Sequence, residues 1–409
     1  MSYELLGKLY YKDNKNYEDI YMSRKNSEFS TSFDWMILNS EAFYMNLPEA
    51  IIQSTRIYKK FADLNKLCAE LPREAYTSYE KKCLIDEIML TNDIEGISST
   101  RKEIIDVLDD DNRSAKKKRF EGMVWKYVLL LDNTISPFEI ELNTSQDIRD
   151  LYDEIVFDEI SPANWPDGEI FRKDPAEVVS ATQQVKHVGV HPEGKIIEYV
   201  DKVLATLKNE NIPQLYKIAI IHYMIGYIHP FYDGNGRLGR FISSYLLKQE
   251  FNTLVALRLS YTIKNQKNEY YKAFDITNDP LNKGDLTHFI MYFSNVVEQS
   301  LDSLLEKLSI GKETLELYSS ALEEKYLTAD LKERRKTAYV LWYLIQNDLF
   351  SNEPFDKKQL AFHLQTGVET AHRYIESLIE AGAPITIEKE GRKYVYILDR
   401  VKLMDFLNS

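Results

Sequence analysis

Cysteine is almost absent from this chain, which has only Cys68 and Cys83 among its 409 residues. The two thiols form no recognisable spacing pattern, so a reducing cytoplasm is the expected location. Long apolar runs are missing as well, since none approaches the roughly 18 residues that a membrane-spanning helix needs. The first residues, Met1 to Leu6, contain neither the basic nor the apolar segment of a signal peptide. These absences predict a cytoplasmic protein with no membrane partner.

Glycine and proline are also scarce, with 15 and 12 residues, so the domain boundaries are faint. An excess of positive charge is lacking too, because the formal net charge is −13, which argues against a general nucleic-acid binder. The composition is 44% hydrophobic and 28% charged. A chain of this length and composition can form two or three domains with a substantial hydrophobic core.

One segment, from His229 to Arg240, reads HPFYDGNGRLGR and carries most of the functional information. The stretch before it, residues 218–228, is apolar enough to predict a buried helix that surfaces at His229. Gly234 and Gly236 free the backbone so that several N–H groups can converge on an anion. A helix starting near Gly236 would add its positive end. The segment therefore predicts a phosphate site.

The charged residues of the segment extend this prediction. Arg237 and Arg240 are three apart on the expected helix and share a face, which suits two phosphate groups of one polyphosphate. Asp233 offers the hard oxygen ligand that Mg²⁺ prefers. His229, with an ordinary pKa of about 6.5, is the natural base for an attacking hydroxyl. Taken singly, each residue could belong to a plain loop and helix cap, but their combination favours phosphate chemistry.

The same twelve residues resemble, without departure, the signature HxFx(D/E)GNGRxxR of the Fic (filamentation induced by cAMP) family. The resemblance implies a helical core that transfers AMP from ATP and Mg²⁺ to a Ser, Thr or Tyr hydroxyl of a target protein. It makes His229 the general base, Asp233 the metal ligand and Asn235, with its neighbouring amides, the α-phosphate cradle. The residues that it implies for nucleotide binding are Asp233, Gly234, Asn235, Gly236, Arg237, Leu238, Gly239, Arg240, Tyr271 and Asn278.

A shorter signal lies upstream in the segment TNDIEG, residues 91–96. Helical spacing puts Thr91 and Glu95 on one face, and Gly96 is a plausible stop for a helix running from about Lys82. Alone this pattern is ordinary. It resembles the (S/T)xxxE(G/N) inhibitory helix of the Fic family, which implies that Glu95 pairs with Arg240 and keeps the enzyme mostly idle.

Two further segments resemble parts of that family. Residues 177–180 and 185–188 predict two short strands around a polar turn and resemble the flap that registers a target segment through Val179 and Ser180. An edge hairpin of purely structural purpose is the alternative. Tyr271 and Asn278 resemble adenine and ribose contacts, although aromatic residues at helical spacing are also typical of a core.

The last segment predicts helices at residues 335–347, 357–365 and 368–381, followed by a hairpin around Glu390–Lys393. This order is typical of a winged helix. DNA is one candidate partner and protein docking is the alternative. The residues available for DNA contact would be His372, Arg373, Arg392 and Lys393.

The predicted fold class is therefore mainly α: a helical Fic core with a small β-hairpin flap, an N-terminal helical segment carrying the inhibitory helix, and a C-terminal winged helix. The expected domains are residues 1–110, with the inhibitory helix at about 82–95, then 111–325 and 331–409. A homodimer is a further candidate assembly. Two other functions stay open: a hydrolase that removes AMP with Glu95 positioning water, and a DNA-binding regulator with a nucleotide-sensing core.

Overall fold

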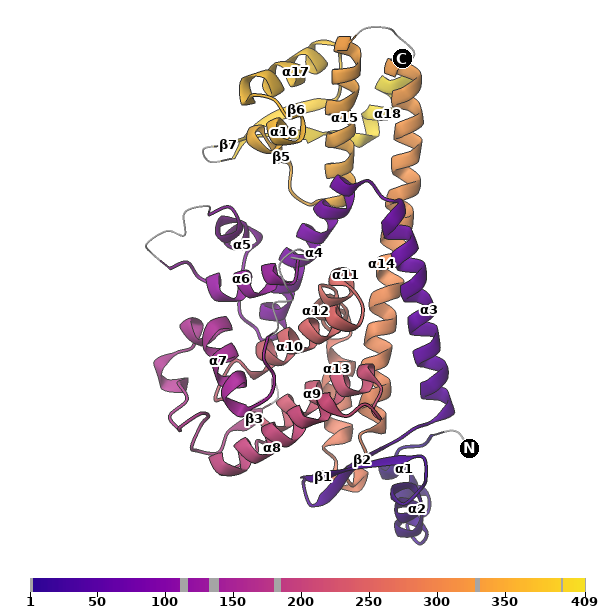
Figure 1. Cartoon of the computed structure of the whole chain (residues 1–409), viewed down its shortest axis with the longest axis vertical. Coiled ribbons are helices and arrows are strands. Elements are labelled where there is room, and N and C mark those ends of the chain that lie inside the picture. The colour runs from indigo at the N-terminus through magenta and orange to yellow at the C-terminus, as the bar shows by residue number, and fades with distance from the viewer. Residues whose placement is uncertain are drawn as a thin grey trace. The chain divides into compact units, whose positions relative to one another are not determined.

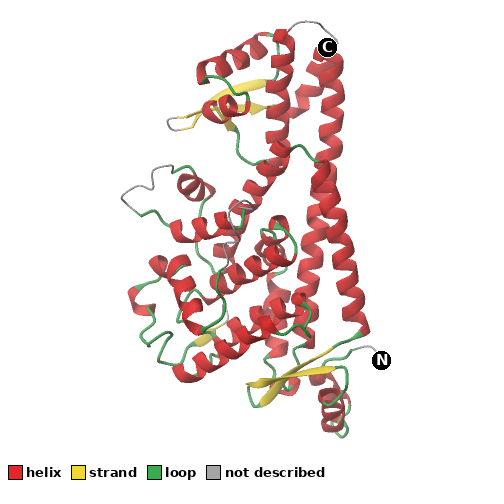
Figure 2. Ribbon diagram, viewed as in Figure 1, coloured by secondary structure: helices red, strands yellow, loops and turns green. Residues whose placement is uncertain are grey.

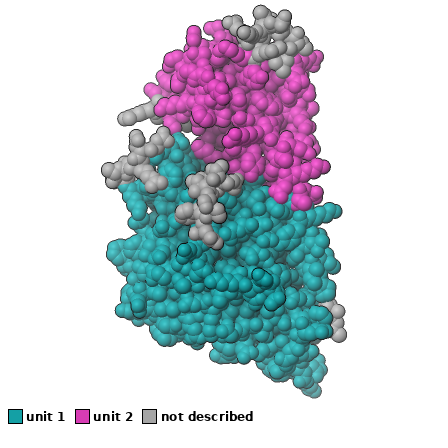
Figure 3. Space-filling view, viewed as in Figure 1, with its two compact units in different colours: residues 1–61, 84–302 teal, residues 62–83, 303–409 magenta. Residues whose placement is uncertain are grey.

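The computed structural model describes residues 3–110, 117–131, 140–179, 185–327, 332–390 and 393–408. The chain is mainly helical with small sheets, as the sequence predicts (Figure 2). It divides into two compact units, residues 1–61 with 84–302, and residues 62–83 with 303–409 (Figure 3). Among the described residues no helix is both long and apolar enough to cross a membrane.

The first unit is a set of helices with two antiparallel hairpins (Figure 1). Its hairpins are β1 (Ser30–Ile37) with β2 (Ser40–Met45), and β3 (Glu177–Val179) with β4 (Val185–Val188). Its helices are α1 (Leu6–Lys12), α2 (Tyr17–Lys25), the start of α3 (Pro48–Glu70), the end of α4 (Arg73–Ile94), α5 (Arg101–Leu108), α6 (Glu121–Leu129), α7 (Ser145–Ile155), α8 (Glu193–Ala205), α9 (Gln214–Ile228), α10 (Asn235–Glu250), α11 (Thr253–Ala256), α12 (Leu259–Asn265), α13 (Lys267–Thr277) and the start of α14 (Thr287–Leu322).

Helices α9 and α10 form the centre of this unit, and both are buried along most of their length. The predicted buried helix before His229 is thereby confirmed, and it begins at Gln214. Inside it, His222 shares hydrogen bonds with Ser243 Oγ at 2.8 Å and Tyr270 OH at 2.9 Å. Burial lowers the pKa of His222 to about 3, so its ring is a neutral part of the core. His222 therefore joins α9 to α10 and α13 within the core.

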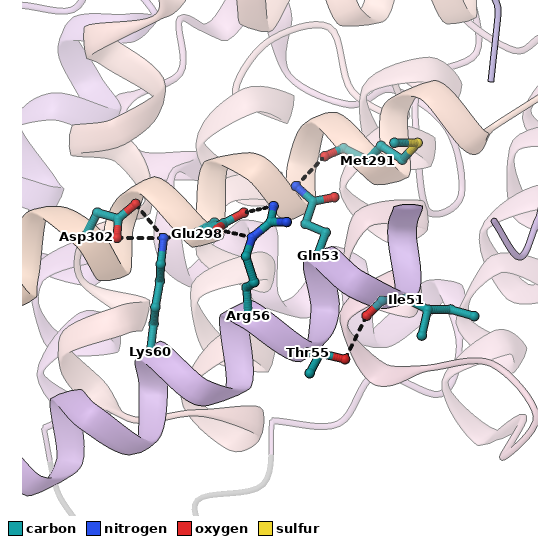
Figure 4. Close-up of polar contacts among 8 residues, drawn as sticks. All are labelled: Ile51, Gln53, Thr55, Arg56, Lys60, Met291, Glu298 and Asp302. Atoms are coloured by element: carbon teal, nitrogen blue, oxygen red, sulfur yellow. Dashed lines mark hydrogen bonds and ion pairs between the residues drawn. The ribbon is translucent and has the colours of Figure 1, made fainter. Parts of the chain in front are cut away.

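Helices α3 and α14 lie side by side, and a row of polar contacts sets their register (Figure 4). Arg56 donates through Nε and Nη2 to Glu298 at 2.9 and 3.1 Å. Lys60 Nζ contacts Glu298 at 3.0 Å and Asp302 at 2.8 Å. Such solvent-exposed ion pairs contribute little to stability, so apolar burial, including that of Ile57, provides most of the stabilisation.

The hairpin β1–β2 corrects the prediction that the first 110 residues contain only helices. Phe43 of β2 donates its N–H to Gly284 O at 3.0 Å and accepts from Leu286 N–H at 2.8 Å. Gly284 has φ of 75°, and a Cβ there would lie 2.6 Å from Glu41 O. The hairpin is thus completed by a segment far away in the sequence, which local patterns do not reveal.

The second unit contains the end of α3, the start of α4, the end of α14 and the C-terminal elements. Its three-stranded sheet has the order β5–β7–β6. The expected order of helices and hairpin is present, but the first helix is longer than residues 335–347, the second is shorter than residues 357–365, and β5 and α18 were not predicted. These elements are α15 (Lys332–Phe350), β5 (Phe355–Asp356), α16 (Lys357–His363), α17 (Val368–Glu380), β6 (Ile385–Glu390), β7 (Lys393–Leu398) and α18 (Arg400–Asn408).

Candidate active site

The loop between α9 and α10 is rigidly organised. His229 ends α9 with φ of 51°, a left-handed conformation that few non-glycine residues adopt. The side chain of Asn235 locks the loop, accepting from Phe231 N–H at 3.0 Å and donating to Phe231 O at 2.8 Å. Phe231 is buried and stacks on Tyr152, with ring centroids 3.6 Å apart. The side chain of Asn235 therefore shapes the loop and leaves backbone N–H groups to face a ligand.

The N-terminus of α10 offers an anion site. Gly234 precedes the helix with φ of 86°, and the first N–H groups of a helix have no partner within it. A Cβ at Gly236 would lie 1.9 Å from Oε1 of Glu95, so this carboxylate lies directly against the first turn of α10. Asp233 beside it is exposed, and its Oδ1 accepts from Gly234 N–H at 2.6 Å.

Arg240 is buried, and residues at and just after the end of α4 accept hydrogen bonds from it. Its Nε donates to Thr91 Oγ1 at 2.7 Å, and its Nη2 donates to Thr91 O at 2.9 Å and to Glu95 Oε1 at 2.7 Å. Burial opposes ionisation of Glu95, but the ion pair outweighs it and the pKa of Glu95 is lowered. The helix ends at Ile94 and Gly96 follows with φ of 76°, which confirms the predicted stop. The structure thus brings Thr91, Glu95 and Arg240 together.

The helix that carries Glu95 is longer than expected, because α4 begins at Arg73 rather than near Lys82. A buried glutamate, Glu87, anchors α4 to α12. It accepts hydrogen bonds from Ser260 N–H at 2.8 Å and from Ser260 Oγ at 2.6 Å. Burial raises the pKa of Glu87 to about 7, although these hydrogen bonds and Arg240 favour its ionised form.

The raised pKa of Glu87 gives a testable dependence of stability on pH. Between about pH 4.5 and 7 the folded protein retains a proton at Glu87 that the unfolded chain has lost, so the free energy of unfolding falls as pH rises across this window. We expect Glu87→Gln to remove on the order of 1 to 3 kcal/mol of this fall. Thermal unfolding at pH 5 and pH 8 measures it. Glu306→Gln, an exposed glutamate of α14, should leave the difference between the two pH values unchanged.

Arg237 also has a carboxylate partner, which the sequence analysis missed. Its Nη1 donates to Glu159 Oε2 at 2.7 Å, and burial raises the pKa of Glu159 to about 7 despite this contact. Nε of Arg237 is buried, and none of the described residues accepts a hydrogen bond from it. A cavity of about 720 Å³ opens beside Arg237 and Asp233 and is also lined by Glu159, Lys118 and Arg119.

His229 is kept neutral at physiological pH. Burial lowers its pKa to about 4, with the positive charge of Arg172 and the ring of His187 acting in the same direction and Glu95 acting against them. A neutral imidazole can accept a proton from a hydroxyl. Arg172 and His187 were not assigned to this environment from the sequence, because each reaches the end of α9 through backbone carbonyls.

The other predicted residues differ in how close they lie to this centre. Tyr271 is 43% exposed on α13 and is near enough to Glu95 and Arg240 for their charges to affect its pKa, which burial raises. Asn278 accepts a hydrogen bond from Tyr223 OH at 2.6 Å. Leu238 and Gly239 are buried in α10, and Gly239 permits close packing on α9 because its Cβ would lie 3.4 Å from Ile225.

The flap prediction is confirmed as secondary structure, since β3 and β4 pair with Glu177 opposite Val188 and Val179 opposite Val185. Ser180 and the polar turn lie outside the described residues.

These residues fit a nucleotide with a divalent cation. No group of three or more potential metal ligands occurs in the described part of the chain. In general, Mg²⁺ is bound through one or two carboxylates together with substrate phosphates. Asp233 supplies an exposed carboxylate, and the absence of a side chain at Gly236 lets an acidic group approach the helix end, as Glu95 does. Arg237 has a buried Nε from which no described residue accepts a hydrogen bond.

Comparison with known proteins finds a family match for the part of the chain that contains this site. Residues 142–247 match the model of the Fic/DOC family. This part of the chain is similar to the Fic/DOC family. The match begins at the start of α7, covers the flap, His229 and Arg240, and ends within α10. The family resemblance inferred from the motif is confirmed, whereas the match does not include the segment that carries Glu95.

Two distant relatives and one solved structure are similar to this chain. The chain is 28% identical over 138 residues to the protein adenylyltransferase Fic of Drosophila erecta, covering 32% of this chain and 26% of that protein. It is 26% identical over 165 residues to the protein of the same name in Drosophila virilis. The chain thus spans about a quarter to a third of the length of these relatives. A Fic family protein from Desulfovibrio desulfuricans G20 shares the fold, with a TM-score of 0.53, 16% identity, and coverage of 87% of this chain and 98% of that chain.

Proposed function

We propose that this Fic/DOC protein transfers AMP from Mg·ATP to a hydroxyl side chain of a target protein and is restrained by Glu95. The distant relationship to protein adenylyltransferases supports the reaction type. The observation that carries the restraint is the position of Glu95, whose carboxylate contacts Arg240 at 2.7 Å and lies against Gly236. A negative charge therefore already occupies the end of α10 where a phosphate would bind.

In the proposed reaction the target hydroxyl oxygen attacks the α-phosphorus, the bond to the β-phosphate breaks, and pyrophosphate leaves. His229 accepts the hydroxyl proton, because its lowered pKa leaves the imidazole unprotonated at neutral pH. Amides at the start of α10 stabilise the developing charge on the α-phosphate. Arg237 and Arg240 bind the β- and γ-phosphates and orient the leaving group. A magnesium ion held by Asp233 would neutralise phosphate charge.

The decisive experiment is incubation of host lysate with labelled ATP and the Glu95→Gly variant, followed by mass spectrometry of labelled proteins. It reports the reaction and the target together. Label transferred as AMP to protein side chains supports the proposal, whereas label transferred as phosphate, or to no protein at all, contradicts it.

Asp233→Ala is expected to abolish AMP transfer, because a single carboxylate of the loop is available to hold the metal. In the Glu95→Gly background we expect activity to depend on added Mg²⁺ and to fall by about 10² or more when Asp233 is replaced. Titration of activity with Mg²⁺ and EDTA measures this. Asp174→Ala, an exposed aspartate outside the motif, is the control. Full activity in excess EDTA would exclude the metal role.

Removal of AMP from a modified target by the same site is the second candidate function. Glu95 is close enough to His229 to raise its pKa electrostatically, so its carboxylate could position a water molecule beside the base. A hydrolysis assay with pre-modified target separates the two reactions. Release of AMP by wild type, but not by Glu95→Gly, would favour hydrolysis.

The C-terminal unit has the element order of a winged helix, and we propose protein docking for it rather than DNA contact. Helix α17 contains three glutamates, Glu369, Glu376 and Glu380, but only one arginine, Arg373. Carboxylates on a helix placed in a DNA groove would be repelled by the phosphates. His372 is engaged with Tyr396 OH at 3.0 Å, and Arg392 lies outside the described residues. Gel-shift binding at graded salt tests this proposal, and tight, salt-sensitive DNA binding would reject it.

A further inference from the structure

One buried arginine, Arg172, donates hydrogen bonds to the carbonyl groups at the end of α9. The proposed reaction does not use this residue. Its Nε donates to His229 O at 2.8 Å, and its Nη2 donates to Val190 O at 2.8 Å and Ile228 O at 3.4 Å. Its backbone N–H donates to Pro230 O at 3.3 Å. Three consecutive carbonyls that the helix leaves free are thus bound by a single residue.

Arg172 is an unusual buried charge. It is 0% exposed, and across the described ranges no carboxylate forms an ion pair with it. Its remaining nitrogen, Nη1, donates to another carbonyl, that of Asp174, at 2.6 Å. A buried cation without an anion is costly, but the partial negative charge at the end of α9 lies directly against this one. The guanidinium is therefore matched to the helix end that carries His229.

The same arginine joins that helix end to the base of the flap. Val190 follows β4 and donates its N–H to Ile228 O at 3.0 Å while its carbonyl accepts from Arg172. Gly189 is tightly enclosed, since a Cβ there would lie 2.5 Å from Arg172 Nη2 and 3.0 Å from His229 Cβ. The flap, the guanidinium and the backbone of His229 therefore pack as one cluster.

We propose that Arg172 is a positioning residue for His229, fixing the left-handed backbone of the base against the flap. This inference rests on the proposed role of His229 as the base. A rigid link between base and flap would align His229 with a target hydroxyl carried by a strand paired to the flap. The charged groups that face His229 are Arg172 before the flap, His187 on β4 and Glu95 after α4.

An activity-independent measurement tests the electrostatic part. In histidine-labelled protein, the NMR signal that disappears in His229→Ala identifies the ring. In wild type this signal should keep its neutral-imidazole shift down to about pH 5. Because Arg172 disfavours the protonated ring, Arg172→Gln should move the titration upward by about one pH unit, whereas Arg172→Lys, which keeps the charge, should not. Lys173→Gln removes an exposed neighbouring charge and is the matched control.

Steady-state kinetics in the Glu95→Gly background tests the alignment. Arg172→Lys and Arg172→Gln should each lower kcat by about tenfold or more, with KM for ATP within about twofold, because Arg172 contacts the base and not the nucleotide site. Gly189→Ala should lower kcat in the same way, since its new methyl group displaces the guanidinium without removing its charge. Lys173→Gln should match the parent.

An unchanged His229 titration in Arg172→Gln, with kcat equal to the parent, overturns the inference. A loss of stability and ATP affinity without a change in the His229 signal also overturns it, since Arg172 would then have only a structural role. Should Arg172→Gln not fold, Arg172→Lys and Gly189→Ala decide by the same kinetic criteria. If the Glu95→Gly parent transfers no AMP, the proposed function fails, while the NMR comparison still decides whether Arg172 controls His229.

Discussion

Glu95→Gly is expected to raise AMP transfer by at least about tenfold, equivalent to about 1.4 kcal/mol. The carboxylate contacts the guanidinium of Arg240 at 2.7 Å and lies against the first turn of α10, so in the proposed reaction the phosphates of ATP would have to displace it. Removing the carboxylate leaves Arg240 still held by Thr91 through Oγ1 and the carbonyl, in place for a γ-phosphate. Incorporation of labelled AMP into protein measures the gain.

Two companion variants make this expectation specific. Arg240→Ala in the Glu95→Gly background should abolish AMP transfer, because the guanidinium that Glu95→Gly releases for phosphate binding is then missing. Glu95→Gln removes the charge but keeps the size of the side chain, so it should activate less than glycine if the side chain also obstructs the site sterically. Folding should change little, since Glu95 follows the last turn of α4 and its side chain is 31% exposed. Wild type as active as Glu95→Gly, with equal ATP affinity, would reject the restraint.

The parts of the site that the sequence predicts are those encoded by neighbouring residues. His229 to Arg240 form one turn between two helices, so their residue types and spacing suffice to predict a phosphate site. The start of α5 is equally local, since Thr100 and Glu103 form a capping box there. Local hydrogen bonding and apolar periodicity determine these features, and both are visible in a short window of sequence.

The parts that escape prediction depend on distant residues. Glu159 reaches Arg237 across 78 positions and Arg172 reaches His229 across 57, and neither is marked by a local motif. The pairing of Glu95 with Arg240 spans 145 positions and was expected only through the family resemblance. Asn235 was assigned to phosphate from that resemblance, whereas its side chain is occupied by both backbone groups of Phe231. Tertiary packing decides which of several possible partners each polar group finds.

The replacement of His229 by alanine should have the largest effect of all. We expect a loss of about 10² to 10⁴ in the rate of AMP transfer in the Glu95→Gly background, because this is the usual contribution of a general base and the lowered pKa of His229 keeps its imidazole neutral at pH 7. ATP affinity should stay within about threefold, since the base acts on the hydroxyl and contributes little to binding of the nucleotide. Titration calorimetry with ATP and single-turnover transfer assays separate the two quantities.

The pH dependence of the parent enzyme supplies the control for this role. With the pKa of His229 lowered to about 4, transfer should stay nearly constant from pH 8 down to about pH 5 and decline only where the imidazole becomes protonated. His222→Ala is not a suitable comparison, because that ring is hydrogen-bonded at both nitrogens inside the core. His191→Ala, an exposed histidine after the flap, should leave rate and pH profile unchanged. A His229→Ala enzyme that retained near-parental transfer would show that another group removes the proton, and the lowered pKa of His229 would then need a different explanation.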